Sequence, residues 1–249
     1  MPSASVAIAP DRPFVPTRWF AKTAATQTVS LSTLVRDMPL RRRMVRSREH
    51  VFRAGQSRHS LYLVHAGIFK TSILSEDGRE KITGFRLPGD LLGLEALDQA
   101  RFTCDAMALD VGEVWELPCE ELTERLPAFQ QALTGALAAE IRRDWHWMLS
   151  VATLTAEQRV VAFLLDLGSR LGALGFSAQR MTMRMTRADL GNFLGLKLET
   201  VVRALSRLQS LGLIQIEGHE IRILEANRLS TLLVGGTSVS EASTAALAA

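Results

Sequence analysis

The clearest chemistry in this sequence belongs to Glu199 and Arg203, which stand four positions apart in a segment with a helical pattern. This spacing places both side chains on one face of a helix. An arginine can donate two hydrogen bonds to O6 and N7 of guanine, and a glutamate can accept one from N4 of cytosine. Lys197, Thr200 and Arg207 are better placed for phosphate oxygens. The alternative interpretation of Glu199 and Arg203 is a surface ion pair, whose energetic value would be small.

The elements that must position these residues are two short helices joined by a tight turn, over residues 187–205. Thr186 can cap the first helix, with Asp189 three positions later, and we include Thr186 among the candidate DNA contacts. Gly191 leaves room for the second helix to cross closely, and Gly195 tolerates the positive φ that a sharp turn requires. This combination matches the helix-turn-helix that binds DNA.

The residues around this pair of helices extend the pattern. Thr155 and Gln158 form a capping box that begins a helix reaching Leu171. Residues 177–185 alternate methionine with polar residues, which indicates the buried face of a strand rather than a soft-metal site. Residues 215–223 alternate around Gly218 and predict a β-hairpin. A winged helix-turn-helix is therefore expected.

The N-terminal half has the pattern of an antiparallel β-roll or jelly roll. Between Met44 and Leu117, short segments with β character are separated by turn signals such as Glu76-Asp77-Gly78. No glycine lies in a phosphate-loop pattern followed by lysine and serine or threonine, which argues against a nucleotide triphosphatase. The fold class expected for the whole chain is therefore α+β.

A long helix connects the two halves. From Ala128 to Ala152 apolar residues recur at helical spacing, and a helix of this length exceeds what a small roll can cover. We interpret its stripe as a seam between two protomers. The residues assigned to this dimer interface are Phe129, Leu133, Leu137, Ile141, Asp144 and Met148. Asp144 would weaken association by charge repulsion across the two-fold axis, or it lies solvated at the edge of the stripe.

Composition narrows the class further. The chain has 249 residues, 47% of them hydrophobic and 22% charged, and no stretch long and apolar enough for a membrane span. The N-terminus does not have the pattern of a secretion signal. Two cysteines, Cys104 and Cys119, are too few for a disulfide framework or an all-cysteine metal site, so a reduced cytoplasm is the simplest location. Basic residues gather at 41–48, where a solvated surface is an equal alternative to a phosphate contact, and again between Arg180 and Arg207.

These residues resemble the CRP/FNR family of bacterial regulators over roughly Leu31 to Leu229. The most specific part runs from Met185 to Leu196 and continues with Glu199, Thr200 and Arg203; it looks like the FNR branch, as does the block from Lys81 to Gly93. The resemblance implies a homodimer that binds an inverted repeat near promoters and contacts RNA polymerase, through a loop at Ser75–Glu80 that favours activation. It also implies that Glu199 and Arg203 contact bases and that Asp144 tunes dimerisation.

The sequence departs from the family in ways that bear on its ligand. Members that sense oxygen hold a [4Fe–4S] cluster with N-terminal cysteines and one cysteine in the roll, but no cysteine precedes Cys104 here and Trp115 matches the roll ligand. A [4Fe–4S] cluster is therefore not expected. Cyclic-nucleotide binders carry an arginine next to serine or threonine, whereas this chain has Phe102-Thr103-Cys104 with Arg101 one position off. Glu95 would mimic the ribose ligand, yet cAMP is not expected. Val202 stands where the FNR branch commonly has serine, which leaves the outer half-site preference open.

The signal stays open at this stage. A haem held by His146 or His65 would make the chain a sensor of NO or CO, although a histidine on the exposed side of the long helix is the simpler interpretation of His146. Oxidation of Cys104 or Cys119 and control by abundance alone are the other hypotheses. No nucleophile–base pair or metal-ligand spacing indicates an enzyme.

The predicted organisation has five parts. They are a flexible leader at 1–27, a β-roll sensor domain at 28–126, a dimerisation helix at 127–152, a winged helix-turn-helix at 153–234 and a disordered tail at 235–249. The predicted function is an activator that binds an inverted-repeat promoter site as a homodimer and responds to oxygen, NO or redox conditions without an iron–sulfur cluster. The alternative is a cyclic-nucleotide-gated module that controls a partner protein, with the helix-turn-helix used for protein contacts.

Overall fold

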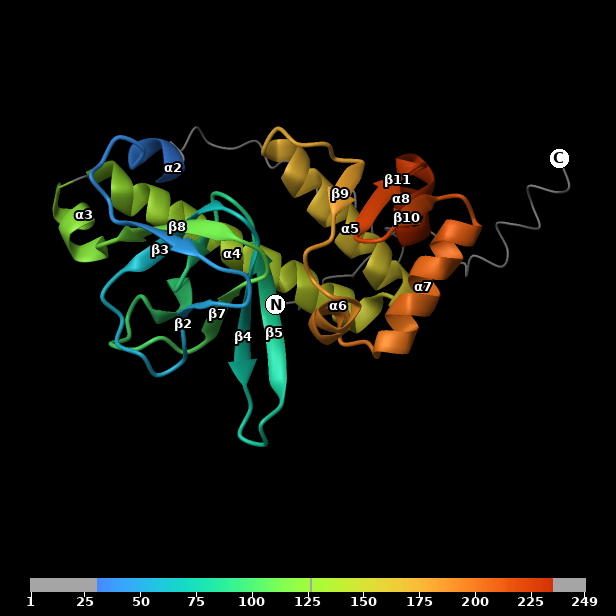
Figure 1. Ribbon diagram of the computed structural model, residues 1–249, viewed down its shortest axis with the longest axis horizontal. Coiled ribbons are helices and arrows are strands. Elements are labelled where there is room, and N and C mark those ends of the chain that lie inside the picture. The colour runs from blue at the N-terminus through green and yellow to red at the C-terminus, as the bar shows by residue number, and fades with distance from the viewer. Residues whose placement is uncertain (1–30, 126, 235–249) are drawn as a thin grey trace, which may run out of the picture.

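The computed structural model describes residues 31–125 and 127–234. The leader predicted at 1–27 and the tail predicted at 235–249 lie outside these residues. The described chain has a β-roll at one end and a helical domain with a small sheet at the other, and a long helix runs from the first to the second (Figure 1).

Two four-stranded antiparallel sheets form the roll, as the turn-separated segments predict. One sheet has the order β1-β8-β3-β6, with β1 at Arg42–Val45, β8 at Gly112–Leu117, β3 at Leu61–Ala66 and β6 at Leu91–Leu92. The other has the order β2-β7-β4-β5, with β2 at His50–Phe52, β7 at Asp105–Ala108, β4 at Phe69–Leu74 and β5 at Glu80–Arg86. A 3-10 helix, η1, covers Leu94–Ala96. Strand β5 is an edge strand of its sheet, which leaves one side of its backbone unpaired within the roll.

The long helix α4 spans Pro127–Thr153, and the short helix α3 at Cys119–Arg125 precedes it. Proline suits the first position of a helix because the missing amide hydrogen has no partner there. The first half of α4 packs on its own roll together with α2 (Leu31–Leu34). A hydrophobic cluster that includes Leu31, Leu117 and Phe129 fills this contact.

Helix α5, at Ala156–Ala173, begins the C-terminal domain, and the predicted capping box at Thr155 and Gln158 is present. Helices α6 (Arg187–Leu194) and α7 (Leu198–Ser210) follow. Strands β10 (Ile214–Glu217) and β11 (Glu220–Ile223) form the expected hairpin, and α8 occupies Ala226–Val234. Strand β9, at Arg180–Thr182, is shorter than the predicted 177–185 and adds a third strand beside β11.

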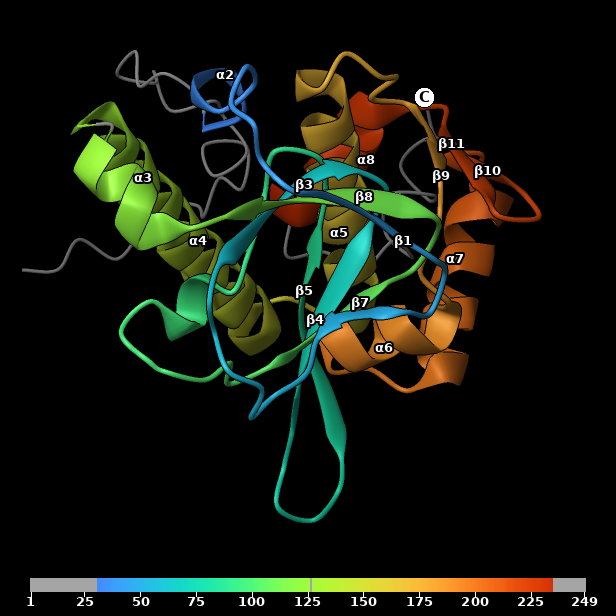
Figure 2. The same cartoon turned by 60° about the vertical axis from the view of Figure 1, so that its left-hand side comes forward.

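The hydrophobic core of the C-terminal domain extends into the roll. One buried cluster contains side chains of α5, α6 and α7 together with three residues of the roll. These three are Ile82 and Phe85 of β5, and Leu87 immediately after the strand. The ring of Phe85 lies 5.3 Å from that of Phe193 in α6, measured between centroids. Figure 2 shows α6 beside the β4–β5 hairpin, consistent with this contact. None of the described helices is long and apolar enough to cross a membrane.

Candidate nucleic-acid interface and sensor cavity

The turn between α6 and α7 has the geometry that its sequence predicts. The Thr186 hydroxyl accepts a 3.0 Å hydrogen bond from the Asp189 amide, and the Asp189 carboxylate accepts one of 3.0 Å from the Thr186 amide. Gly195 ends α6 with a φ of 67°, a left-handed conformation that glycine adopts without strain. The Leu196 amide donates to the Gly191 carbonyl oxygen at 2.8 Å. These contacts fix α7 across α6 as in a helix-turn-helix.

Helix α7 has one buried and one exposed face. Val201, Leu205 and Leu208 are buried in the core of the domain. Glu199 and Arg203 are exposed on the other side, as their spacing predicts. Val202, beside Arg203, is 45% exposed. The exposed face is therefore free to meet the edges of bases in a major groove.

The residues predicted to contact phosphates fall into two groups. Lys197, immediately before α7, is exposed, and the amides of the first turn of α7 lie beside it, an arrangement that favours an anion. Thr200 is half-buried in the same turn. Arg207 and Thr186 already have partners in the protein. The Arg207 Nε atom lies 3.2 Å from a carboxylate oxygen of Glu157, and the Thr186 hydroxyl donates to Asp189 at 2.7 Å.

Of the residues predicted to form the dimer interface, some are buried within the protomer and others are exposed. Phe129 has no exposed surface because it fills the core between α4 and its own roll, so its assignment to a dimer seam is wrong. Leu133 and Leu137 are partly buried against the same core. Ile141 is 44% exposed and Met148 is 67% exposed.

Asp144 lies between these two residues in the sequence, and its side chain is exposed. Partial desolvation of its carboxyl group raises its pKa, and the negative charge of Glu140 raises it further. Trp145 is 60% exposed on the same stretch of α4, but it is not among the residues predicted to form the dimer interface. Its position four residues after Ile141 places it on the same helix face and would have indicated it. The second half of α4 thus presents an apolar surface that the described residues, 31–125 and 127–234, leave exposed.

A cavity of about 350 Å³ lies between the roll and α4. Its lining includes apolar side chains of both elements, among them Leu91, Leu137 and Ile141. Among the described residues, the charged groups in the lining are three carboxylates and one guanidinium: Glu95, Glu140, Asp144 and Arg86. Arg86 is already paired with Glu140 at 2.5 Å, and Glu95 accepts a 3.2 Å hydrogen bond from the Cys104 thiol.

This lining does not fit a cyclic nucleotide. A cyclic phosphate carries a negative charge, and the carboxylates around the cavity would repel it. Arg101 does not line the cavity; its guanidinium donates to the Gly55 carbonyl oxygen at 2.6 Å. Arg86 is the one arginine that the described part of the chain contributes to the lining, and binding a phosphate there would have to displace Glu140.

Of the two histidines considered for a haem, His146 is buried and His65 is exposed. His146 is 8% exposed, so the expectation that it lies on the exposed side of the long helix is wrong, and burial lowers its pKa. His65 stacks on Trp115 with ring centroids 4.4 Å apart. Neither histidine lines the cavity. Within residues 31–125 and 127–234, no group of three or more His, Cys, Asp or Glu side chains is arranged to hold a metal ion.

Both cysteines are buried. Burial, followed by Glu95, strongly raises the pKa of the Cys104 thiol. Because the thiolate is the reactive form, this environment disfavours oxidation of Cys104.

Two family models match the chain in succession. A cyclic nucleotide-binding domain matches residues 42–127, and a Crp-like helix-turn-helix domain matches residues 158–232. The chain is 40% identical over 198 residues to the transcriptional activator protein Anr of Pseudomonas aeruginosa, a match that covers 78% of this chain and 81% of that protein. It is 37% identical over 195 residues to an anaerobic regulatory protein of Haemophilus influenzae, covering 77% and 76% of the two chains.

The fold is also shared with a solved structure. FixK2 from Bradyrhizobium japonicum superimposes with a TM-score of 0.71 at 30% identity, over 80% of this chain and 99% of that one.

Proposed function

The chain belongs to the CRP/FNR family of bacterial transcription regulators, and from this premise we propose that it binds an inverted-repeat promoter site as a homodimer and activates transcription. Its relatives are DNA-binding regulators and not enzymes, and the same class applies to this chain. In this proposal the roll is the sensor, α4 is the dimerisation helix and the domain from residue 153 binds DNA.

The observation that carries the proposal is the exposed face of α7. Glu199 and Arg203 project from it while Val201 and Leu205 anchor the helix in the core. We assign Arg203 to guanine and Glu199 to cytosine, because these pairings satisfy the donors and acceptors that each base presents in the major groove. Lys197 and Thr200 would hold the neighbouring phosphates. Arg207 would support them less, since Glu157 neutralises part of its charge.

The exposed half of α4 supports a dimer. Ile141, Trp145 and Met148 offer large apolar side chains that a second copy of the helix would remove from water. Asp144 lies among them, so two copies would bring like charges together near the two-fold axis. In the proposed dimer, the apolar side chains would favour association and Asp144 would oppose it.

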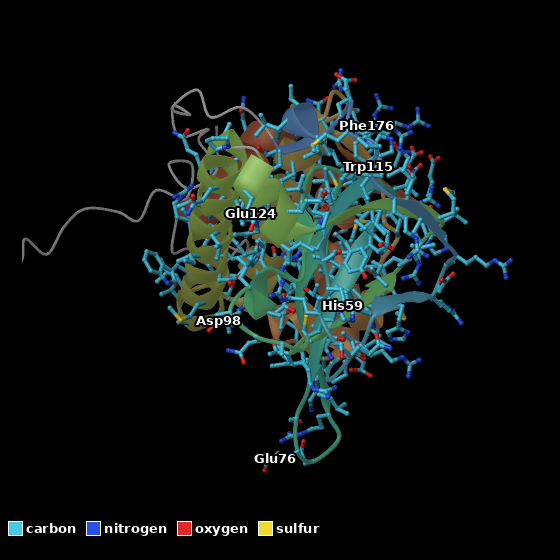
Figure 3. The ribbon with its side chains drawn as sticks, turned by 90° about the vertical axis from the view of Figure 1, so that its left-hand side faces the viewer. His59, Glu76, Asp98, Trp115, Glu124 and Phe176 are labelled. Carbon is cyan, nitrogen blue, oxygen red and sulfur yellow. The ribbon has the colours of Figure 1, made fainter. Side chains whose placement is uncertain are left out.

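The β4–β5 hairpin supports a contact with RNA polymerase. Figure 3 shows Glu76 at the tip of this hairpin, standing away from the rest of the molecule. Leu74 at its base is 71% exposed, and residues 75–80 are exposed as well. The tip does not contribute to the core of the roll, so it is free to contact another protein while α7 holds DNA.

For the signal, the name of the Haemophilus influenzae relative, an anaerobic regulatory protein, favours a role in anaerobic regulation. With only two cysteines, both buried, the chain has too few thiolates of its own for a four-cysteine cluster. The packed position of His146 does not favour a haem. The carboxylate-rich cavity makes the cyclic-nucleotide-gated alternative the weaker one. We propose that the chain acts in oxygen or redox control without an iron–sulfur cluster of its own.

The experiment that tests the proposal is selection of binding sites from a random duplex library by the purified full chain. The expected product is a set of sequences that share two inverted half-sites about one helical turn apart. Recovery of unrelated sequences after repeated rounds would overturn the proposal.

A further inference from the structure

A side-chain amide on the first helix of the helix-turn-helix binds the backbone at the edge of the roll. Asn192 of α6 accepts a 2.8 Å hydrogen bond from the Ile82 amide and donates one of 2.8 Å to the Glu80 carbonyl oxygen. Both groups belong to the free edge of β5, so the Asn192 amide takes the place of a neighbouring strand. Lys81 also donates to the carbonyl oxygens of Asn192 and Phe193, at the end of α6 where a cation is favourable.

A second attachment holds the beginning of the same helix. Lys70 of β4 is 7% exposed, and its Nζ atom lies 3.0 Å from Asp189 and 3.1 Å from Glu80. Asp189 therefore caps α6 and binds the roll with the same carboxylate. Although burial opposes it, hydrogen bonds to Asp189 and Glu80 hold the pKa of Lys70 above its ordinary value. The pair is charged at neutral pH and is shielded from salt by its partial burial.

Helix α5 is attached to the roll next to α6. Arg170 donates to the Phe85 carbonyl oxygen at 3.2 Å and to the Asp90 carboxylate. Arg143 of α4 lies 3.4 Å from the same carboxylate. The roll, the long helix and the DNA-binding domain therefore meet around Asp90, and together with Lys70 and Asn192 this fixes α5 and α6 on one rigid support.

These contacts do not cover the DNA-binding face. Glu199 and Arg203 remain exposed while α6 is attached to β5. The attachment therefore sets the orientation of α7 without blocking it. Because α7 follows α6 after the tight turn at Gly195, any rotation of α6 on the roll would carry α7 with it.

From this arrangement we propose that Lys70, together with Lys81, Asp189 and Asn192, is a positioning group that determines which half-site spacing the protein accepts. The inference rests on the proposed function. In a two-fold dimer the distance between the two recognition helices is fixed by how each is held relative to the dimer helix, and the spacing of half-sites follows from that distance. A loosened attachment lets α7 adjust, so the protein tolerates spacings that the intact protein rejects.

The test compares Lys70→Met and Lys81→Met with the wild type on duplexes whose half-sites are at the selected spacing or are moved by one or two base pairs. Lys70→Met removes a buried charge. Lys81→Met removes only the contact with the end of α6, so this variant provides the test if Lys70→Met fails to fold. Arg58→Met is the matched control, because the Arg58 side chain donates its hydrogen bond within the roll, to the Gln99 carbonyl oxygen. Affinities are measured by fluorescence anisotropy, and folding is checked by thermal unfolding.

The wild type and Arg58→Met are expected to prefer the selected spacing strongly. In the two lysine variants this preference should fall about five- to tenfold, in the range of ordinary coupling between sites, while affinity for a single half-site is unchanged. A folded Lys81→Met or Lys70→Met protein with the wild-type spacing profile would overturn the inference. If the wild type selects no inverted repeat, the proposed function itself fails, and the two failures are thus distinguished.

Discussion

The Leu196 amide donates a 2.8 Å hydrogen bond to the Gly191 carbonyl oxygen, and the Leu196 carbonyl oxygen lies 2.7 Å from where a Cβ atom on residue 191 would be. The turn and the helix before it are thus in backbone contact, with no room for a side chain between them. This contact sets how α7 crosses α6. It is the local relationship on which presentation of Glu199 and Arg203 depends.

Gly191→Ala tests this contact. The added methyl group meets backbone rather than a flexible side chain, so α6 and the turn must separate, and we expect a loss of about 1–3 kcal/mol in the free energy of unfolding. Urea denaturation measures it. Gly135→Ala in α4 is the control, because nothing lies within 4 Å of its added methyl group, and it should be stabilising by about 0.5–1 kcal/mol. Equal stability of the two variants would contradict the close approach.

Arg203→Ala and Lys197→Ala separate base contacts from phosphate contacts. Arg203→Ala should lose about 1–3 kcal/mol of discrimination at one base pair of each half-site. Lys197→Ala should weaken binding to all duplexes alike and reduce the slope of log affinity against log salt by about 1. Titrations at several salt concentrations measure both. An Arg203→Ala protein that discriminates all base pairs as the wild type does would remove Arg203 from its assigned role.

Met148→Glu tests the dimer surface. A carboxylate on this exposed apolar stretch, close to Asp144, should oppose association by charge repulsion and by loss of apolar contact. Sedimentation equilibrium should show a monomer where the wild type is a dimer. Phe176→Glu is the control, since Phe176 is 63% exposed but lies outside α4. If both variants remain dimers, the interface lies elsewhere.

Arg170→Leu tests the junction around Asp90. Burial alone would raise the pKa of Asp90, but Arg170 and Arg143 hold it below its usual value. Removing Arg170 leaves the partly buried carboxylate poorly paired, with an expected cost of about 3 kcal/mol in unfolding free energy. Arg180→Leu, which breaks an exposed pair with Glu220, should cost much less, because water screens the charges of an exposed pair. Similar losses in the two variants would contradict a structural role for the junction.

The pH dependence of stability should report His146. Burial lowers its pKa in the folded chain, so the unfolded chain binds a proton more readily. Stability is then lost as the pH falls below the unfolded value of about 6.5. His146→Gln cannot titrate and should lose less stability than the wild type between pH 7.5 and pH 5.5, as measured by urea denaturation at each pH. Parallel losses in the two proteins would show that His146 accepts a proton in the folded state without penalty.

Local signals in the sequence were sufficient for the DNA-binding helices. The capping pair Thr186 and Asp189, the turn at Gly195 and the face of Glu199 and Arg203 each depend on residues within a few positions of one another, and the structure contains the capping pair and the turn as predicted.

Periodicity failed where two partners compete for one helix face. The stripe on α4 contains both Phe129, which packs on its own roll, and Met148, which is exposed, and helical spacing alone does not distinguish them. The attachment of α6 to the roll had no local signal, because Lys70 and Asp189 are 119 positions apart. The charge of the cavity likewise arises from residues of separate elements, Glu95 in η1 and Glu140 on α4.

The most direct test of the central claim is an equilibrium titration of the wild-type chain against three labelled duplexes: the selected inverted repeat, the same duplex with one half-site scrambled, and one with both scrambled. The account predicts two chains bound per intact repeat, with affinity for it about 10³-fold or more above that for the fully scrambled duplex, and intermediate binding to the single half-site. Equal affinity for all three duplexes at physiological salt would contradict sequence-specific binding by a dimer.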